Sequence, residues 1–146
     1  MAGVVYLDTS SLLKLIWPEQ ESEVVAERVS LEEVVLVSSL AELESKIQIT
    51  AGHLRGDYSL SLSRRLGREL DQLLDTEPFR RRALSGGVFE SALVQHTRYG
   101  VNAFCRTLDR LHLAAMEELG VRRLITHDLH LAGAARALGF IAEIPA

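Results

Sequence analysis

The chain has 146 residues, of which 47% are hydrophobic and 25% are charged, and its formal net charge is −4. This length suits a single domain over residues 1–146, and the composition excludes a disordered or fibrous chain. No apolar run approaches the ~18 residues of a membrane span, so we expect no membrane partner. The single cysteine, Cys105, excludes an internal disulfide and a cysteine-ligated zinc site. We therefore expect a reducing, cytoplasmic location and a Cys105 that is a small buried hydrophobe.

Short apolar segments and amphipathic segments alternate along the first part of the chain. Residues 3–7 are apolar and β-prone, and they predict a strand that stops at Asp8. A helix is expected over residues 11–17, and residues 19–29 carry a second helical pattern. Residues 33–37 predict a second strand, so strand and helix alternate from the beginning.

A long helix is expected after the second strand. Its apolar residues share one face, which we expect to be buried against the rest of the protein. These residues are Leu40, Leu43, Ile47, Ala51 and Leu54. Residues 59–76 predict another helix. Residues 77–102 carry no legible pattern, because proline and glycine residues interrupt them.

The last third of the chain returns to a clear pattern. Residues 108–119 are apolar almost all round, which predicts a helix buried on most sides. Residues 122–126 and 140–144 predict strands, and between them Asp128 precedes a helix over residues 129–138. The whole alternation predicts a three-layer α/β/α fold with a central, mostly parallel sheet of four to five strands. Functional groups gather at the carboxyl ends of the strands in such sheets.

Two aspartates follow predicted strands and should therefore lie at the same edge of the sheet. Asp8 ends the first strand, and Asp128 follows the strand over residues 122–126 by two positions. An aspartate before a helix is often only its N-cap, which is the structural alternative for Asp128. The N-cap alternative is weaker for Asp8, because Ser10 could cap the helix that follows it.

Helical geometry separates two glutamates on the long helix. With Leu40 at zero, Glu44 lies at about 40° and Glu42 at about 200° around the helix, so Glu44 faces inward with the apolar stripe. Ser39 and Glu42 have the spacing of a capping box, which explains Glu42 structurally. An inward carboxylate needs a cation or a hydrogen-bond donor. The alternative for Glu44 is a bond to an arginine from a neighbouring element.

A fourth acid stands at the start of the most apolar helix. Asp109 has a structural alternative, since an aspartate in the first turn interacts favourably with the helix dipole. The four candidate site residues are Asp8, Glu44, Asp109 and Asp128. Converging carboxylates repel one another and raise one another's pKa, so their convergence implies a bound cation. An all-oxygen set without cysteine suits Mg²⁺ or Mn²⁺.

Other polar residues are weaker candidates. The guanidinium group of arginine can donate two hydrogen bonds to a phosphate. Two clusters of arginines are therefore candidate contacts for a nucleic-acid backbone. The alternative is that both clusters are solvent-exposed faces of helices. They comprise Arg64, Arg65, Arg80, Arg81 and Arg82. Thr9, Ser10 and Thr126 could orient the carboxylates, and ordinary capping is their alternative. His112, one turn after Asp109, is expected to be a hydrogen-bonded core residue.

Four segments of the chain, spread from residue 6 to residue 139, form a set of motifs. They are residues 6–15 (YLDTSSLLKL), 38–44 (SSLAELE), 108–115 (LDRLHLAA) and 124–139 (LITHDLHLAGAARALG). In their order and spacing the chain resembles the PIN-domain ribonucleases, and most closely the VapC-like toxins of toxin–antitoxin pairs. Two features depart from that pattern: His127 stands where the family commonly has an aromatic residue, and residues 77–102 match nothing in it.

The resemblance implies an activity and partners. It implies that Asp8, Glu44 and Asp109 hold Mg²⁺ or Mn²⁺ and that Asp128 assists them, so that the enzyme hydrolyses RNA. It also implies a cognate antitoxin protein and a homodimer. Two alternatives within the family are a PIN-like module that binds RNA or a protein without cutting, and a nuclease acting on other structured RNA or DNA outside a toxin–antitoxin system. A phosphoacceptor receiver domain is an alternative from another class of protein. Such a domain requires a lysine near its last strands, and this chain has no lysine there.

Overall fold

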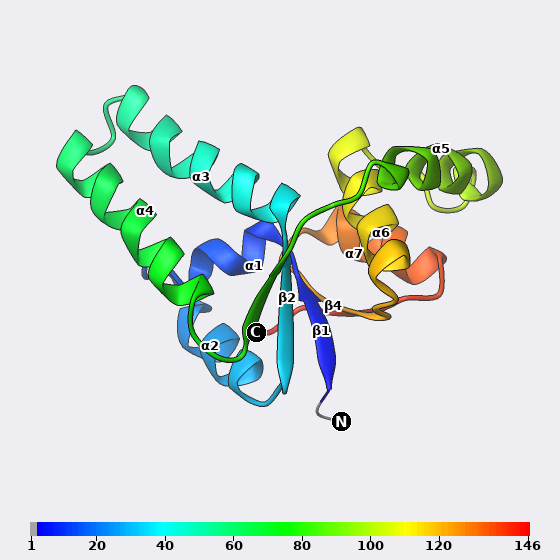
Figure 1. Ribbon diagram of the computed structural model, residues 1–146, viewed down its shortest axis with the longest axis horizontal. Helices are drawn as coiled ribbons and strands as arrows, with labels where there is room; N and C mark the ends of the chain where they lie inside the picture. Colours follow the sequence, from blue (N-terminus) through cyan, green and yellow to red (C-terminus); the bar gives the residue numbers. More distant parts are fainter. Residues whose placement is uncertain (1–2) are drawn as a thin grey trace.

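Five parallel strands form the centre of the molecule in a computed structural model that describes residues 3–146. The sheet has the order β3-β2-β1-β4-β5, and Figure 1 labels β2, β1 and β4. The strands are β1 (Val4–Leu7), β2 (Val34–Ser38), β3 (Phe79–Arg82), β4 (Arg123–Ile125) and β5 (Ile141–Glu143). Every neighbouring pair is parallel, which confirms the predicted sheet.

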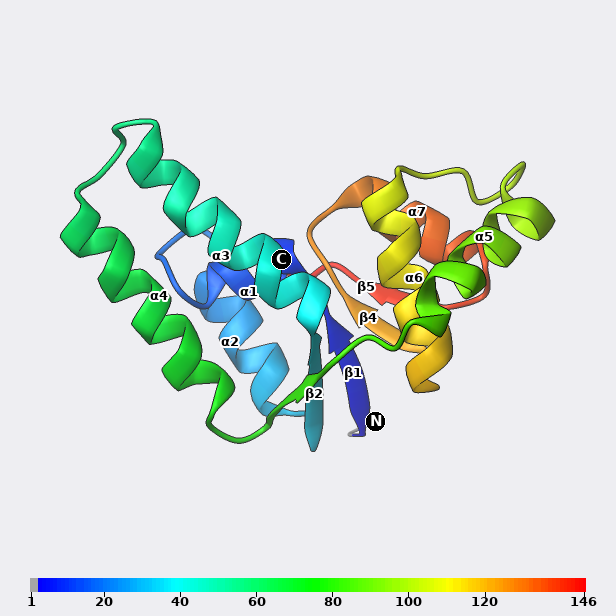
Figure 2. The ribbon, with the colours of Figure 1, turned by 45° about the horizontal axis from the view of Figure 1, so that its top comes forward.

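Helices cover both faces of the sheet and complete three layers. One face carries α1 (Thr9–Lys14), α2 (Ser22–Ser30), α3 (Ser39–Leu54) and α4 (Leu60–Leu74). The other face carries α5 (Gly87–Tyr99), α6 (Thr107–Leu119) and α7 (Leu129–Ala137). Figures 1 and 2 show α3 and α4 as an antiparallel pair that reaches well beyond the sheet. Among the helices of residues 3–146, none combines the length and the hydrophobicity of a membrane-spanning segment.

The alternation of side chains along β1 explains why both faces are covered. Val5 and Leu7 pack into the core under α1 to α4, whereas Tyr6 between them packs into the core under α5 to α7. All three side chains are fully buried. A strand buried on both faces has a continuous apolar sequence, as residues 4–7 do.

The order of the strands creates a natural place for a site. From β1 the chain proceeds outward through β2 to β3, and it later returns to the other side of β1 with β4 and β5. The direction of winding therefore reverses between β1 and β4, and ligands commonly bind outside the carboxyl ends of strands at such a point. Leu7 pairs with Ile125 at this end, so Asp8 and the residues that follow β4 are neighbours.

The segment over residues 77–102, which carried no legible pattern, contains the edge strand β3 and the helix α5. Phe79 is the buried residue of β3, and the three residues after it are arginines. An edge strand that is open on one side needs little apolar sequence, which is why the pattern did not reveal it. Helix α5 buries only Val88, Ala92 and Gln95, so its apolar face is weak.

The prediction that the apolar stripe of α3 is buried is wrong. Leu43, Ile47 and Leu54 are 55%, 56% and 81% exposed. The buried residues of this helix are Ala41, Ser45, Ile49 and Gly52. Because α3 extends beyond the sheet beside α4, the face that it buries is the one with small residues, and the larger apolar side chains point to solvent.

Two smaller expectations also need correction. Helix α1 begins at Thr9 rather than at residue 11, and its N-cap is Asp8, whose side chain accepts the backbone N–H of Ser11. Cys105 is half-buried rather than fully buried, and this burial raises the pKa of its thiol.

A buried glutamate binds the amino ends of three strands together. Glu32 precedes β2, and its side chain is only 1% exposed. It accepts the guanidinium of Arg123 from β4, the guanidinium of Arg28 at 2.8 Å and the backbone N–H of Gly3 at 3.0 Å. Burial would raise the pKa of Glu32, but these donors outweigh it and hold the pKa at about 2.

Candidate active site

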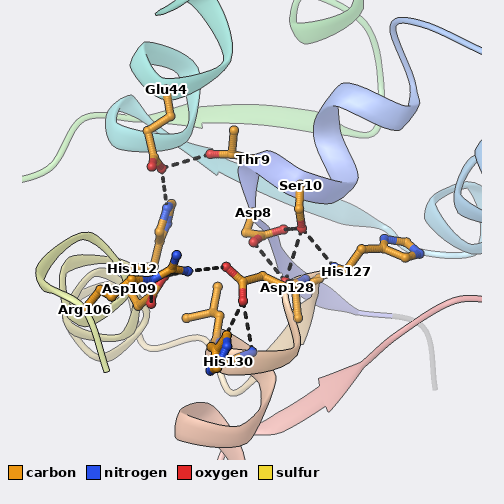
Figure 3. Close-up of polar contacts among 12 residues, drawn as sticks. Asp8, Thr9, Ser10, Glu44, Arg106, Asp109, His112, His127, Asp128 and His130 are labelled. Carbon is orange, nitrogen blue, oxygen red and sulfur yellow. Dashed lines mark hydrogen bonds and ion pairs between the residues drawn. The ribbon is translucent and has the colours of Figure 1, made fainter. Parts of the chain in front are cut away.

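A cavity of about 510 Å³ lies at the carboxyl ends of β1 and β4. It is lined by α1, by α3, by the start of α6 and by the residue that precedes α7. Asp8, Glu44, Asp109 and Asp128 all lie in its wall (Figure 3). The structure therefore brings the four predicted acids to one cavity, although they come from four separate segments of the chain.

Asp8 is buried and is held through both carboxylate oxygens. Its Oδ1 accepts the Ser10 hydroxyl at 2.8 Å and the Ser11 backbone N–H at 3.3 Å. Its Oδ2 accepts the Thr126 hydroxyl at 2.8 Å. Burial raises the pKa of Asp8, against the lowering effect of His112 and of these hydrogen bonds. Ser10 and Thr126 thus contact the acid that they were expected to orient.

The same two hydroxyl groups join the segments that follow β1 and β4. The Thr126 hydroxyl oxygen accepts the backbone N–H of Asp128, and the Ser10 hydroxyl oxygen accepts that of His127, both at 2.9 Å. The ring of His127 lies between the Ser11 hydroxyl and the carbonyl oxygen of Pro145 and points away from the acids (Figure 3). His127 therefore supports the loop and is not part of the cavity wall.

Glu44 is half-buried and has two donors on one oxygen. Its Oε1 accepts the Thr9 hydroxyl at 2.9 Å and lies 2.5 Å from His112 Nε2. Partial burial would raise the pKa of Glu44, but these hydrogen bonds lower it. The alternative that an arginine pairs with this carboxylate is wrong, because its hydrogen-bond partners are a threonine and a histidine.

Glu42 lies outside the cavity and forms ion pairs on the surface. It pairs with Arg81 at 2.7 Å and with Lys46 at 3.4 Å. The N-cap of α3 is Ser38, whose hydroxyl accepts the N–H of Ala41, so the capping box expected from Ser39 is wrong. The two glutamates flank the buried face of α3 on opposite sides, and only Glu44 reaches the cavity.

Arg106 links the other two acids, and nothing in the sequence pattern had singled it out. Its Nε lies 2.9 Å from Asp109 Oδ2, and its Nη2 lies 2.8 Å from Asp128 Oδ2. Asp128 uses its other oxygen, Oδ1, to cap α7 through the N–H groups of His130 and Leu131. Asp128 is therefore the N-cap of α7, which was the alternative considered for it, and it also lines the cavity.

The four carboxylates do not form a ready-made ligand cluster. Within residues 3–146, no three histidine, cysteine, aspartate or glutamate side chains lie close enough together to hold a metal ion. Arg106 supplies the positive charge that convergence of the acids was expected to require from a cation. The donor set still suits a hard divalent ion in its chemistry, since all four side chains offer carboxylate oxygens to one cavity.

The two predicted arginine clusters lie elsewhere. Arg64 and Arg65 are exposed on α4, and residues 80–82 lie in β3 at the edge of the sheet. Arg81 is paired with Glu42, Asp71 and Asp75. None of these arginines lines the cavity. Their contact with a nucleic-acid backbone stays a prediction, whereas Arg106 is the arginine that the cavity contains.

The fold and the acidic cavity define a known class of domain. Residues 5–137 match the family model of the PIN domain. The chain belongs to the PIN domain family, which confirms the resemblance found in its four motifs.

Among curated proteins, the chain is similar to Ribonuclease VapC46 of Mycobacterium tuberculosis. The two are 30% identical over 145 residues, which cover 98% of each. Two crystal structures show the same fold. One is VapC20 of Mycobacterium tuberculosis, described as a Sarcin-Ricin loop cleaving toxin, with 18% identity, a TM-score of 0.69 and 97% and 99% of the two chains covered. The other is VapBC2 of Rickettsia felis bound to a DNA fragment from its promoter, with 13% identity, a TM-score of 0.70 and 96% and 97% covered.

Proposed function

We propose that this chain is a metal-dependent endoribonuclease that hydrolyses RNA phosphodiester bonds as the toxin of a toxin–antitoxin pair. The observation that carries the proposal is the placement of four carboxylates in one cavity at the point where the sheet reverses its winding. Membership in the PIN domain family and the similarity to a protein named Ribonuclease VapC46 support RNA as the substrate.

The carboxylates of Asp8, Glu44 and Asp109 would hold Mg²⁺ or Mn²⁺, with Asp128 in a supporting position. When bound, the ion supplies positive charge to the scissile phosphate and lowers the pKa of water. Ser10 and Thr126 hold Asp8 in place, and Thr9 holds Glu44, so these carboxylates need little rearrangement when a ligand enters. Asp128 uses Oδ1 to cap α7, so Oδ2, which accepts from Arg106, is the oxygen that it could offer to an ion.

The metal requirement has a direct test. The purified chain should cleave total RNA in the presence of Mg²⁺ or Mn²⁺, and excess EDTA should abolish cleavage until the ion is restored. Cleavage that continues in EDTA would contradict the proposal. Binding of RNA without cleavage under any ion would identify the chain as a binding module, and faster cleavage of DNA than of RNA would identify another substrate.

The ion pairs of Arg106 lead to a separate prediction about the affinity of the site for a metal ion. Its guanidinium is bonded to Asp109 and Asp128, so it competes with a cation for two of the four carboxylates. Replacement of Arg106 with glutamine should strengthen Mn²⁺ binding by roughly 10-fold, since one positive charge is removed from the cavity. Titration of Mn²⁺ followed by electron paramagnetic resonance measures this change. Arg98→Gln, an exposed substitution on α5, is the control and should leave the affinity unchanged.

We also propose that the chain forms a homodimer and binds an antitoxin, and two exposed apolar surfaces support contacts with other proteins. One is the stripe of Leu43, Ile47 and Leu54 on α3. The other is a groove of about 590 Å³ between α5 and α6 that includes Leu93 and Phe104. Patches of this kind mark interaction sites. Light scattering of the purified chain measures its oligomeric state.

The single domain over residues 1–146 and the cytoplasmic location stay predictions.

A further inference from the structure

A chain of hydrogen bonds runs through the interior from the start of α3 to Glu44. The Ser38 hydroxyl accepts the N–H of Ala41 at 3.1 Å and lies 2.7 Å from the Tyr6 hydroxyl. The Tyr6 hydroxyl lies 2.6 Å from His112 Nδ1. His112 Nε2 in turn lies 2.5 Å from Glu44 Oε1. One continuous path therefore joins the sheet to a carboxylate of the cavity.

The chemistry of the groups gives this path one direction. An ionised carboxylate can only accept, so His112 Nε2–H donates to Glu44. In a neutral imidazole Nδ1 then accepts, and the Tyr6 hydroxyl donates to it while accepting from the Ser38 hydroxyl. The opposite direction would leave the Ser38 proton without an acceptor, because among the described residues the Ser38 hydroxyl is hydrogen-bonded only to Tyr6 and to the N–H of Ala41.

The members of this path are held rigidly. Tyr6 and Ser38 are fully buried on the neighbouring strands β1 and β2, and His112 is 3% exposed on α6. The rings of Tyr6 and His112 meet edge to face, with centroids 5.7 Å apart and planes at 76°. The imidazole therefore has packing on its faces and a hydrogen bond at each nitrogen, so its orientation is fixed.

The result at Glu44 is an asymmetric carboxylate. Thr9 and His112 both donate to Oε1 (Figure 3). Within residues 3–146, Oε2 has no hydrogen-bond donor of its own, while Glu44 lines the cavity. One oxygen is thus anchored and the other is left for a ligand in the cavity.

We propose that His112 is a positioning residue that turns the Oε2 atom of Glu44 toward the ligand of the cavity, and that Tyr6 and Ser38 fix the tautomer in which it does so. This inference rests on the proposed function of Glu44 as a metal ligand. The usual arrangement, in which a carboxylate orients a histidine on a metal, is reversed here, because the histidine orients the carboxylate.

The tautomer is tested first on the metal-free protein, where the result does not depend on the proposed function. Nitrogen-15 NMR of the wild type, recorded at a pH high enough for a neutral imidazole, should show the proton of His112 on Nε2. Tyr6→Phe should remove this single state, because Nδ1 loses its donor, whereas Tyr99→Phe, the same change on the surface of α5, should not. A proton on Nδ1 of neutral His112 in the wild type would overturn the proposal.

The positioning is tested by substitutions that differ in reach. Asparagine at position 112 is too short to donate to Glu44, whereas the amide of glutamine can lie near the place of Nε2. His112→Asn should therefore weaken Mn²⁺ binding by roughly 10- to 100-fold, and His112→Gln should restore much of the loss. Thermal unfolding of each variant shows whether it is folded. Equal Mn²⁺ affinity of His112→Asn and wild type would overturn the positioning role.

Kinetics separate this inference from the proposed function. In His112→Asn, kcat should fall while KM for RNA stays within about 2-fold of the wild type, since the histidine acts through Glu44 and not on RNA. A rise in KM alone, with kcat unchanged, contradicts the positioning role. If wild-type protein binds no Mn²⁺ at all, the proposed function fails and the positioning role fails with it. If it binds Mn²⁺ and both variants bind equally well, only the positioning role fails.

Discussion

Replacement of Asp8 with asparagine should reduce RNA cleavage by roughly 10²- to 10³-fold, because the cavity loses a charge that no other group replaces. Asparagine keeps the size of the side chain, and its carbonyl oxygen can still accept from Thr126 or Ser10. It is also a good N-cap, so α1 should remain intact. The loss should therefore appear in activity and not in folding, as measured by initial cleavage rates beside circular dichroism.

The stability of the same variant gives an independent check. Burial raises the pKa of Asp8, which means that the folded protein holds this charge at a disadvantage. Asp8→Asn should consequently unfold at an equal or higher urea concentration than the wild type, as expected where function and stability compete. Asp57→Asn, on the exposed turn after α3, is the matched control and should change neither quantity. Equal cleavage by the Asp8 variant and the control would rule out the assigned role.

Replacement of Glu32 with glutamine should lower the free energy of unfolding by about 3 kcal/mol, which corresponds to the fall of its pKa from 4.5 to about 2 in the folded protein. The glutamine would leave Arg28 and Arg123 with Glu143 as their remaining acid. Urea unfolding at pH 7 measures the loss. Glu33→Gln, an exposed neighbour, should change stability by less than about 0.5 kcal/mol.

The pH dependence of this effect has a definite sign. The pKa of Glu32 is lower in the folded chain than its ordinary 4.5, so the stabilisation is fully present above that pH. It is lost as the pH falls from 4.5 toward 2, because the carboxylate must then be protonated in both states. The difference between wild type and Glu32→Gln should therefore shrink steadily over this range. A difference that stays constant would show that the ion pairs are not its source.

The sequence predicted best what depends on the order of elements along the chain. Asp8 and Asp128 were placed at one edge of the sheet because both follow strands, and parallel strands end at the same edge. Glu44 is the glutamate that lines the cavity, as predicted, but the reason for choosing it was wrong, because the apolar stripe beside it is exposed. Apolar spacing shows that α3 has two unlike faces, yet it does not say which face the rest of the molecule covers. Here the small residues are covered, and Leu43 and Ile47 are exposed.

The parts that sequence did not reveal depend on contacts between distant segments. Arg106 reaches Asp128 across 22 positions, and His112 reaches Glu44 across 68. No spacing rule within one helix or strand contains such pairs. The signal for Arg106 was local and weak, since an arginine three positions before Asp109 also fits an ordinary ion pair on a helix. Strand β3 was missed for a similar reason, because its neighbour β2 and not its own sequence makes it a strand.

The strand at the centre of the sheet precedes both of its neighbours in the chain, and about 115 residues separate it from the second of them. β1 pairs with β2 on one side and with β4 on the other. The cavity wall draws on residues from Asp8 to Asp128 of a chain of 146. A nascent chain still attached to the ribosome therefore lacks the complete set of carboxylates until Asp128 has been made. The metal site that we propose therefore cannot assemble in a nascent chain that stops short of Asp109.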